Sequence, residues 1–269
     1  MTKYITTLTI AGSDCSGGAG IQADIKTMSA LGCFAASAIT SLTVQNTLGV
    51  TAVMAVEPDI VAGQIRAVMD DILPRAVKIG MVNDCDTIHA IAATLRDYDV
   101  KYLVVDPVMV STSGSRLMQP DALSTFKTEL MPMATLLTPN VPEAEVLSGV
   151  KITDKTTMDE AGRIIISQGC RAVLIKGGHL LGDKIDRLYG TETCDYGGVD
   201  VDTHNTHGTG CTLSSAIASF LALGSPLSEA IKQAKDYVTE ALKAGADVQI
   251  GHGGGPVDHF FNPKKLIKE

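Results

Sequence analysis

The sequence predicts an α/β fold of three layers, in which a mostly parallel central sheet carries helices on both faces. Short apolar segments of strand type alternate along the chain with longer segments of helical period, which is the pattern of repeated βαβ units. With 269 residues, of which 45% are hydrophobic, the chain is long enough to bury one large core. No internal repeat or linker interrupts the pattern, so we expect residues 1–269 to form a single domain.

The elements are expected in a regular order. Strands are expected where short runs of Ile, Val, Leu and Thr end at polar or Gly-rich turns, at residues 5–11, 34–40, 77–80, 102–106, 135–138 and 172–176. Helices are expected between them, where apolar residues recur every three to four positions, at residues 20–31, 59–72, 86–97, 120–130, 142–148 and 158–168. Gly32 and Gly169 follow two of these helices, at positions where a left-handed residue ends a helix.

Beyond residue 176 the pattern changes. Two polar, Gly-rich segments at residues 184–189 and 198–203 predict antiparallel edge strands rather than a further βαβ unit. Two helices are expected to complete the fold. Residues 208–222 are rich in Ser and Ala, and residues 227–244 place apolar side chains along one face, at Leu227, Ala230, Ile231, Ala234 and Val238.

The composition excludes several classes of protein. A formal net charge of −8 argues against a nucleic-acid partner and against an acidic membrane surface, because both select basic patches. No segment approaches about 18 continuous apolar residues, so we expect no membrane-spanning helix. The six cysteines form no CxxC pair and no regular spacing, which argues against a zinc site or a disulfide framework. Reduced thiols in a cytoplasmic protein are the simpler interpretation.

The most informative motif is the pentad from His207 to Cys211. Gly208 and Gly210 allow a tight turn whose N–H groups point inward, and the following helix adds the positive end of its dipole, so the pentad predicts an anion site. Cys211 stands at the helix N-terminus, where the pKa of a thiol can fall toward neutrality, and is therefore an acid/base candidate. The alternative is an ordinary helix start, capped by Thr209, with Cys211 buried as a small apolar residue.

A second Gly-rich loop joins the first strand to the first helix, at residues 11–20. Because such loops lie beyond the carboxyl edge of the sheet, we expect this one to admit a substrate ring close to the backbone, although a tight structural turn is the alternative. The loop matches neither the dinucleotide fingerprint nor the Walker phosphate loop. Asp24 on the first helix and Gln45 after the second strand could together bind the edge of an aminopyrimidine. A solvated Asp24 and a turn at Gln45 are the alternative.

Three further strand ends carry polar side chains. Asp106 ends one strand, and Asn140 and Glu143 follow the next. Asp106 and Glu143 are the candidate Mg²⁺ ligands, since Mg²⁺ prefers oxygen and keeps most of its water, although Glu143 could serve only the first turn of its helix. Lys176 ends a buried strand, where an ammonium group is costly without a negative ligand. It therefore predicts a phosphate partner, and a solvent-facing lysine is the alternative.

Nearly the whole chain, from about residue 5 to residue 242, resembles the ThiD family of hydroxymethylpyrimidine and phosphomethylpyrimidine kinases of thiamine biosynthesis. The resemblance is carried by the segments AGSDCSGGAGIQAD, TVQNT, IGMV, DPVMVSTSG, TPNVPEAEVL, LIKGGH and HGTGCTLSSAIA, in this order. It implies a ribokinase-like fold with ATP over the later half of the sheet and the pyrimidine over the first half. It also implies a homodimer, and because the chain ends at Glu269 we expect no fused downstream enzyme.

The resemblance implies a reaction as well. The γ-phosphoryl group of ATP passes to the hydroxymethyl group of 4-amino-5-hydroxymethyl-2-methylpyrimidine, and a second one passes to the resulting monophosphate. The implied pyrimidine contacts are Gly12, Asp24, Gln45, Met81 and Val108. The implied catalytic groups are Gly208, Gly210, Cys211 and Lys176, the ATP contacts are Lys176, Thr209 and Asn140, and the Mg²⁺ ligands are Asp106 and Glu143.

One departure from the wider superfamily bears on mechanism. Most of its sugar kinases carry Asp where this chain has Cys211. We expect the thiol to be a compromise, because a thiolate can accept the alcohol proton in the first step, while a neutral thiol does not repel the anionic monophosphate in the second. Two alternatives remain. One is a pyridoxal kinase, which Gln45, Met81 and Cys211 disfavour, and the other is a non-catalytic sensor of a thiamine precursor, which Lys176 and Cys211 disfavour.

Overall fold

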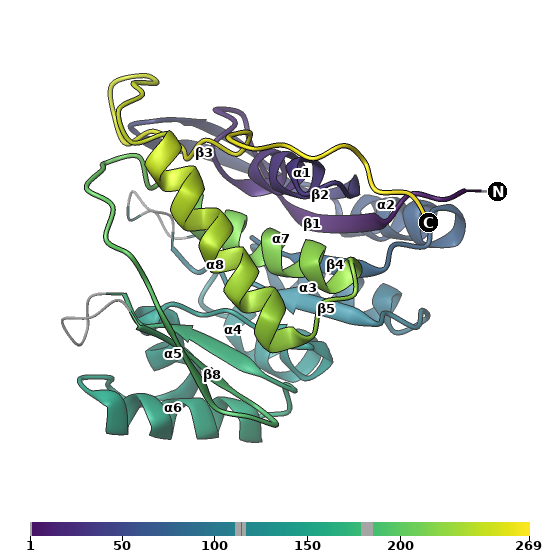
Figure 1. The fold of residues 1–269 in the computed structure, drawn as a ribbon. Helices are drawn as coiled ribbons and strands as arrows, with labels where there is room; N and C mark the ends of the chain where they lie inside the picture. Colours follow the sequence, from purple (N-terminus) through teal and green to yellow (C-terminus); the bar gives the residue numbers. More distant parts are fainter. Residues whose placement is uncertain (1, 111–113, 115–116, 179–184) are drawn as a thin grey trace.

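One continuous sheet organises the molecule. The structure is a computed structural model that describes residues 2–110, 114, 117–178 and 185–269, and within them nine strands are hydrogen-bonded in the order β3-β2-β1-β4-β5-β6-β7-β8-β9 (Figure 1). The strands are β1 (Thr6–Asp14), β2 (Phe34–Asn46), β3 (Gly49–Ala55), β4 (Ala76–Ile79), β5 (Tyr102–Val105), β6 (Leu136–Leu137), β7 (Val173–Lys176), β8 (Ile185–Tyr189) and β9 (Cys194–Gly197).

The centre of the sheet is parallel and its two edges are antiparallel. The parallel pairs join β2, β1, β4, β5, β6 and β7, whereas β3, β8 and β9 pair antiparallel to their neighbours. The predicted mostly parallel sheet is therefore confirmed. After β1 the chain places β2 on one side and β4 on the other, so the order of the strands reverses there. Ligands of open α/β sheets bind beyond the carboxyl ends of the strands at such a reversal.

Helices cover both faces of the sheet, as predicted. One face is covered by α1 (Gly20–Ala30), α7 (Thr209–Ala222) and α8 (Leu227–Ala244), and α8 lies across α7 in Figure 1. The other face is covered by α2 (Pro58–Asp71), α3 (Cys85–Leu95), α4 (Ala122–Thr125), α5 (Val141–Ser148) and α6 (Lys155–Ser167). Gly32 and Gly169 both have positive φ, at 90° and 113°, which confirms them as helix-ending positions.

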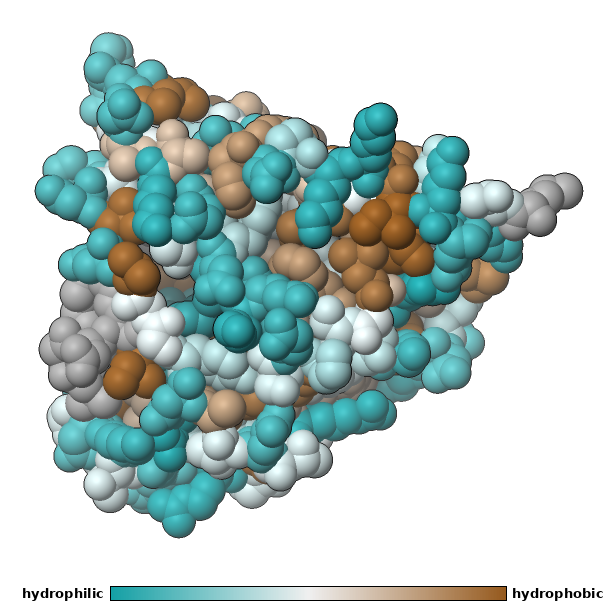
Figure 2. All heavy atoms as spheres, viewed as in Figure 1, coloured by the Kyte–Doolittle hydropathy of each residue, from teal (hydrophilic) through white to brown (hydrophobic). Residues whose placement is uncertain are grey.

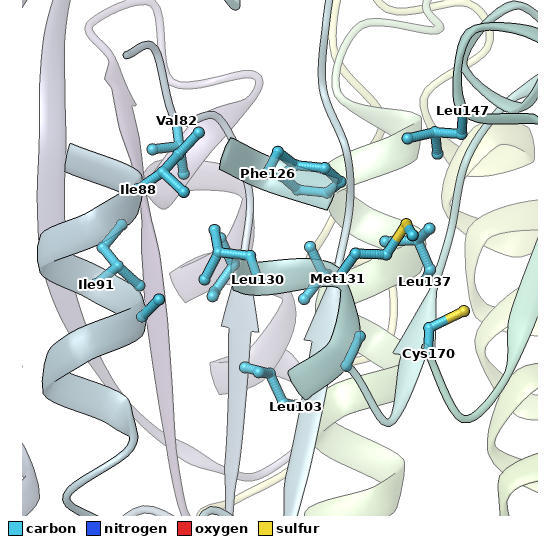
Figure 3. Packing of buried hydrophobic residues seen from close by; sticks show 14 of the residues in the cluster. Val82, Ile88, Ile91, Leu103, Phe126, Leu130, Met131, Leu137, Leu147 and Cys170 are labelled. Carbon is cyan, nitrogen blue, oxygen red and sulfur yellow. The ribbon is translucent and has the colours of Figure 1, made fainter. Parts of the chain in front are cut away.

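Alternate residues of the buried strands supply the two cores. In β4, Ala76 packs under the layer of α1, α7 and α8, while Val77 and Ile79 pack toward α2 and α3. Figure 3 shows how the second core is filled, with aliphatic side chains of the helices meeting those of the strands around one aromatic ring. Its labelled residues are Val82, Ile88, Ile91, Leu103, Phe126, Leu130, Met131, Leu137, Leu147 and Cys170.

Three elements differ from the sequence prediction. The last edge strand is β9 at Cys194–Gly197, so the strand predicted at residues 198–203 is wrong, and those residues instead run toward the 207–211 turn. Strand β3 was not predicted, because most of its side chains are exposed and give no apolar alternation. The helix predicted at 120–130 is divided into α4, a π-helical turn at Phe126–Leu130 and a 3₁₀ turn at Met131–Met133, where Pro132 removes a backbone donor.

The two ends of the chain pair with each other, because Lys3 N donates to Glu269 O and Glu269 N donates to Lys3 O, each at 3.0 Å. On the face shown in Figure 2, hydrophilic residues predominate and separate the apolar ones into patches. Among the described residues, no helix is both long and apolar enough to cross a bilayer.

Candidate active site

A cavity of about 490 Å³ lies at the carboxyl edge of the sheet. It is lined by residues in the last part of β1, β2 and β7, by residues that follow β4, β5 and β6, and by the turn that begins α7. Of the residues predicted for the site, twelve line this cavity: Gly12, Gln45, Met81, Asp106, Val108, Asn140, Glu143, Lys176, Gly208, Thr209, Gly210 and Cys211. Asp24 does not line it within the described residues. The two Gly-rich segments of the sequence therefore face one common space.

The turn at residues 208–211 packs directly against the first loop. Gly208 is the N-cap of α7 and has φ of +79°, and a Cβ atom there would collide with the backbone oxygen of Gly18. Only glycine combines this left-handed conformation with so close an approach. Thr209 does not cap the helix, because its hydroxyl donates to Thr206 O at 3.0 Å. Thr209 N also donates to Thr206 O, at 3.3 Å, so the backbone N–H groups of Gly210 and Cys211 are the ones that the N-terminus of α7 offers to an anion.

An ion pair faces the turn from the sheet. Lys176 Nζ donates to Asp106 Oδ1 at 3.1 Å, and Thr138 Oγ1 donates to the same oxygen at 3.1 Å. A Cβ atom on Gly210 would lie 3.5 Å from both Asp106 Oδ2 and Lys176 Nζ, so this pair stands opposite the glycine turn. Burial alone would lower the pKa of Lys176, but Asp106 and Glu143 raise it. The ammonium group therefore stays charged beside the anion site.

Glu143 has a structural role and also faces the cavity. Its backbone N–H donates to Asn140 Oδ1 at 2.9 Å and its Oε2 accepts from Asn140 N at 2.8 Å, which forms a capping box at the start of α5. Burial and the charge of Asp106 raise the pKa of Glu143 to about 7, although Lys176 acts against them. The carboxyl group therefore changes charge near neutral pH.

The electrostatic prediction for Cys211 is wrong. The sequence predicts a thiol with a lowered pKa, but burial raises the pKa of Cys211 to about 11. Lys78 and a backbone hydrogen bond from Gly20 lower it, while Asp24 and Asp106 raise it further. The desolvation of the sulfur and the charges of two nearby carboxylates raise the pKa of the thiol by more than the helix N-terminus lowers it. In the free protein Cys211 is therefore a neutral thiol at neutral pH.

The opposite end of the cavity is suited to a flat ring. Gly12 leaves room there, because a Cβ atom would collide with the methyl group of Met81 and would lie 2.7 Å from Ser41 Oγ, so that both side chains would have to move. Met81, Val108 and Gln45 line the same end, and they combine apolar contact with one amide group. The structure thus brings these predicted contacts together from β1, β2, β4 and β5.

Asp24 requires a correction. The resemblance implies that it contacts the pyrimidine, but its side chain has no exposed surface and accepts three hydrogen bonds from two groups. Lys78 Nζ lies 2.9 and 2.8 Å from its two oxygens, and Thr9 Oγ1 donates to it at 2.6 Å. Spacing alone does not reveal which face of α1 meets the sheet. Although burial would lower the pKa of Lys78, the Asp24 carboxylate raises it, so this pair remains ionic.

Several cavity residues were missed by sequence reasoning. Asp14 and His207 stand inside the two quoted Gly-rich motifs, and Thr43 lies two residues before Gln45, so proximity to the motifs was the available signal. The other end of the cavity has an apolar wall, formed by Val199, Leu213, Val238 and Leu242, and a Lys235–Asp186 ion pair. This wall comes from α7, α8 and the segment after β9, which no local motif identifies.

The carboxylates suit one kind of metal ion. Among the residues that the structure describes, no cluster of three or more His, Cys, Asp or Glu side chains could hold a metal ion on its own. Mg²⁺ needs no such cluster, since it keeps several water molecules and takes one or two carboxylates together with substrate phosphates. Asp106 and Glu143, which both line the cavity, therefore fit this ion.

The chain is similar to known kinases over almost its full length. The profile of a family described as phosphomethylpyrimidine kinase matches residues 14–258. The hydroxymethylpyrimidine/phosphomethylpyrimidine kinase of Rhizobium meliloti is 50% identical, over 94% of this chain and 96% of that protein. The thiamine biosynthesis bifunctional protein ThiED of Geobacter sulfurreducens is 49% identical over 94% of this chain, which spans 52% of that protein's length.

Solved structures agree with the sequence relatives. The crystal structure of phosphomethylpyrimidine kinase from Clostridium difficile 630 has a TM-score of 0.80 and 50% identity, and the match covers 89% of this chain and all of that one. An ADP complex of pyridoxal kinase from Bacillus subtilis has a TM-score of 0.86 and 35% identity, over 96% of this chain and 98% of that one. These matches confirm the ribokinase-like three-layer architecture.

Proposed function

The chain belongs to the phosphomethylpyrimidine kinase family, and from this premise we propose that it phosphorylates 4-amino-5-hydroxymethyl-2-methylpyrimidine and then its monophosphate, with ATP as donor, in thiamine biosynthesis. One observation carries the proposal. The glycine turn at 208–211, the Lys176–Asp106 pair and the contact between Gly12 and Met81 line a single cavity. Such a cavity can hold an acceptor ring, a phosphoryl group in transfer and a phosphate donor side by side along its length.

We assign the acceptor to the end of the cavity at Gln45. Met81 and Val108 supply apolar contact, Gly12 allows the ring to approach the backbone, and the Gln45 amide offers both a donor and an acceptor. An aminopyrimidine presents the complementary pair, an exocyclic amine beside a ring nitrogen. Asp24 has no part in this assignment because its side chain is fully buried.

The donor occupies the other end in this proposal. The apolar wall at Val199, Leu213, Val238 and Leu242 offers a surface for a nucleotide base. Thr209 and Asn140 also line the cavity, and in this assignment they contact the phosphate groups. Lys176 neutralises the phosphoryl group in transit, and the backbone N–H groups of Gly210 and Cys211 stabilise its oxygens.

The reaction forms a bond between the acceptor oxygen and the γ-phosphorus and breaks the bond between that phosphorus and the β-bridging oxygen. Little covalent assistance is needed from the protein, because phosphoryl transfer depends mainly on positioning and charge neutralisation. Asp106 and Glu143 would hold Mg²⁺, which supplies further neutralisation of the donor phosphates when bound. In the first step the alcohol loses a proton, and Cys211 accepts it in its thiolate form. The monophosphate acceptor is already anionic and needs no base.

In the same proposal the enzyme uses Mg²⁺, residues 1–269 act as one kinase domain, and the protein is a cytoplasmic homodimer. Six free cysteines support a reducing compartment, and one sheet that extends from β3 to β9 among the described residues supports a single domain. The exposed apolar residues of β2 and β3, which are Leu42, Val44 and Met54, support the homodimer.

The direct test incubates the protein with the pyrimidine alcohol, ATP and Mg²⁺ and follows the products by mass spectrometry. Sequential formation of the mono- and diphosphate supports the proposal, and a Lys176→Met variant should lose both products. Product from pyridoxal, in competition with the pyrimidine under the same ATP, would instead support the pyridoxal kinase alternative. Binding of the pyrimidine with no ATP consumption would support the non-catalytic sensor.

A further inference from the structure

A chain of three polar side chains crosses the acceptor end of the cavity. Asp14 ends β1, His207 precedes α7 and Gln45 lies near the end of β2. His207 Nε2 lies 2.9 Å from Asp14 Oδ2 and 3.2 Å from Gln45 Nε2. All three side chains line the cavity, and neither Asp14 nor His207 was identified from the sequence. The hydrogen on the Nε2 atom of His207 therefore bears on which way the Gln45 amide faces.

Asp14 fixes the proton on His207. Burial alone would raise the pKa of Asp14, but hydrogen bonds from His207 and Ser16 hold it at about 2. Ala19 N and Gly18 N also donate to it, at 2.8 and 3.1 Å. Asp14 is therefore a carboxylate at neutral pH, and a carboxylate only accepts hydrogen bonds. His207 Nε2 must carry a hydrogen to approach it at 2.9 Å, whether the imidazole ring is neutral or charged.

The proton on His207 constrains the Gln45 amide. An Nε2–H group cannot accept a hydrogen bond from the amide nitrogen that faces it at 3.2 Å. On the other side, Thr43 Oγ1 lies 3.2 Å from Gln45 Oε1, but its single proton is needed by Ser13 O at 2.9 Å, which accepts only. A half-turn of the amide places its nitrogen toward Thr43 Oγ1, to which it can donate, and its oxygen toward His207 Nε2, whose one hydrogen is then shared between Asp14 Oδ2 and the amide oxygen. Two independent partners thus select the same orientation.

We propose that His207, held by Asp14, is a positioning residue that orients the Gln45 amide and thereby selects an amino-substituted ring over its oxo analogue. With its two lateral positions occupied by His207 and Thr43, the amide keeps one oxygen lone pair and one N–H at its free edge. This is the edge with which a Gln side chain binds an exocyclic amine and an adjacent ring nitrogen in adenine. The inference rests on the proposed pyrimidine substrate and adds the residue that sets its specificity.

The test compares the binding of two ligands by calorimetry. One is 4-amino-5-hydroxymethyl-2-methylpyrimidine, and the other is the analogue with a 4-oxo group, whose donor and acceptor positions are exchanged. The wild-type protein should prefer the amino ring. His207→Phe keeps a flat ring but removes the N–H donor, so the preference, measured as the ratio of the two Kd values, should fall by about tenfold, as expected for one lost hydrogen bond. Thr43→Val should lower the ratio in the same direction.

A merely structural role gives a different result. If His207→Phe only loosens the loop, both ligands weaken equally and the ratio of the Kd values is unchanged, which would overturn the inference. Gln45→Leu provides the reference, because it removes the amide and with it the amide's share of the preference. If the wild-type protein neither binds nor phosphorylates the pyrimidine, the proposed function and this inference both fail. If it phosphorylates the pyrimidine and the ratio does not respond to His207→Phe, the inference alone fails.

A measurement on the wild-type protein tests the same inference without any variant, and so does not depend on whether His207→Phe folds. Nitrogen NMR of ¹⁵N-labelled imidazole rings distinguishes a protonated from an unprotonated Nε2. At pH 8 the His207 ring should carry its proton on Nε2. In Asp14→Asn the carboxylate is gone, so the proton should no longer be confined to Nε2. An unprotonated Nε2 on His207 in the wild-type protein would overturn the inference, because the Gln45 amide could then donate to it.

Discussion

Cys211 shows at the scale of one residue how burial can reverse an expectation from local geometry. A thiol at a helix N-terminus suggests a stabilised thiolate, but the desolvated sulfur has a pKa raised to about 11. At neutral pH only about one molecule in 10⁴ then carries the thiolate. A neutral thiol favours the second phosphorylation, since it places no fixed charge beside an anionic acceptor. If Cys211 is the base, as proposed, the first phosphorylation depends on the rare charged form.

This difference predicts separate pH profiles for the two steps. If the thiolate is the base, kcat/KM of the first step should rise by up to about tenfold per pH unit from pH 8 to pH 10, because the pKa of Cys211 lies above this range. The second step should remain nearly flat. Steady-state assays of Cys211→Ala should show the first step without its slope and slowed more than the second. Cys85→Ala, at the start of α3 and away from the cavity lining, is the matched control. Equal slopes for both steps would contradict the role of Cys211.

Glu143 predicts a dependence of stability on pH with an unusual sign. Its folded-state pKa of about 7 exceeds the ordinary value of 4.5, so the folded protein binds this proton more tightly than the unfolded chain does. Below about pH 4.5 the protonated Glu143 therefore makes its full contribution to the free energy of unfolding. As the pH rises to 7 this contribution is lost, and the free energy of unfolding falls by up to about 3 kcal/mol. Glu143→Gln should remove this loss, because Gln keeps the capping box without a charge.

The measurement is chemical denaturation at pH 4 and at pH 8. The variant and the wild-type protein should unfold with similar free energies at pH 4, and the variant should be the more stable one at pH 8. Glu145 on the same helix is the control, because Lys151 lowers its pKa and its contribution to stability has the opposite sign. A Glu143→Gln variant that is less stable at pH 8 would show that the charged form is favoured in the fold.

At the scale of elements, the turn that begins α7 packs against the Gly-rich loop after β1, so a change in this turn should affect both the packing and the proposed catalysis. Gly208 and Gly224 lie at the two ends of α7 and both have positive φ, at 79° and 96°. A Cβ atom on Gly208 would collide with the Gly18 backbone, whereas a Cβ atom on Gly224 has nothing within 4 Å. Each substitution by Ala should therefore cost about 1 kcal/mol of backbone strain, but only Gly208→Ala should displace the first loop.

The pair of variants separates strain from displacement. Gly224→Ala should keep kcat near that of the wild-type protein and lower the free energy of unfolding by about 1 kcal/mol. Gly208→Ala should lose at least about a hundredfold in kcat, since a shift of about 1 Å near the reacting groups can have this effect. Kinetic assays and thermal unfolding of both variants provide the comparison. Equal activity in the two variants would remove the argument for close packing at Gly208.

The same elements show how far the sequence determines the site. The buried strands β4, β5 and β7 were predicted to within one or two residues, because their apolar runs end at Gly80, Asp106 and Lys176. The site followed from those ends, since parallel strands bring their carboxyl termini to one edge. Strand β3 was missed because exposed strands give no apolar alternation. Asp24 was misassigned because its partner Lys78 is a charged residue inside a buried strand, and the sequence does not reveal such pairing.

At the scale of the whole molecule, the antiparallel edge of the sheet offers the surface for the proposed homodimer. Leu42 pairs with Met54 across β2 and β3, and Val44 pairs with Ala52, so these side chains share one face. Leu42, Val44 and Met54 are exposed by 42%, 60% and 60%. Thr43, which alternates with them on β2, lines the cavity. A second copy that covers the apolar face would therefore lie directly behind the wall of the acceptor end.

This arrangement predicts that assembly and pyrimidine binding are linked. Met54→Asp should convert a dimer into a monomer in analytical ultracentrifugation, because a charge buried at an apolar contact is costly. The monomer should bind the pyrimidine more weakly, since β2 loses the support that holds Thr43 and Gln45, while its affinity for ATP should change little. Ile60→Asp is the matched control, because Ile60 is similarly exposed, by 58%, but lies on α2. A monomeric wild-type protein, or a Met54→Asp variant that remains dimeric, would exclude this face as the interface.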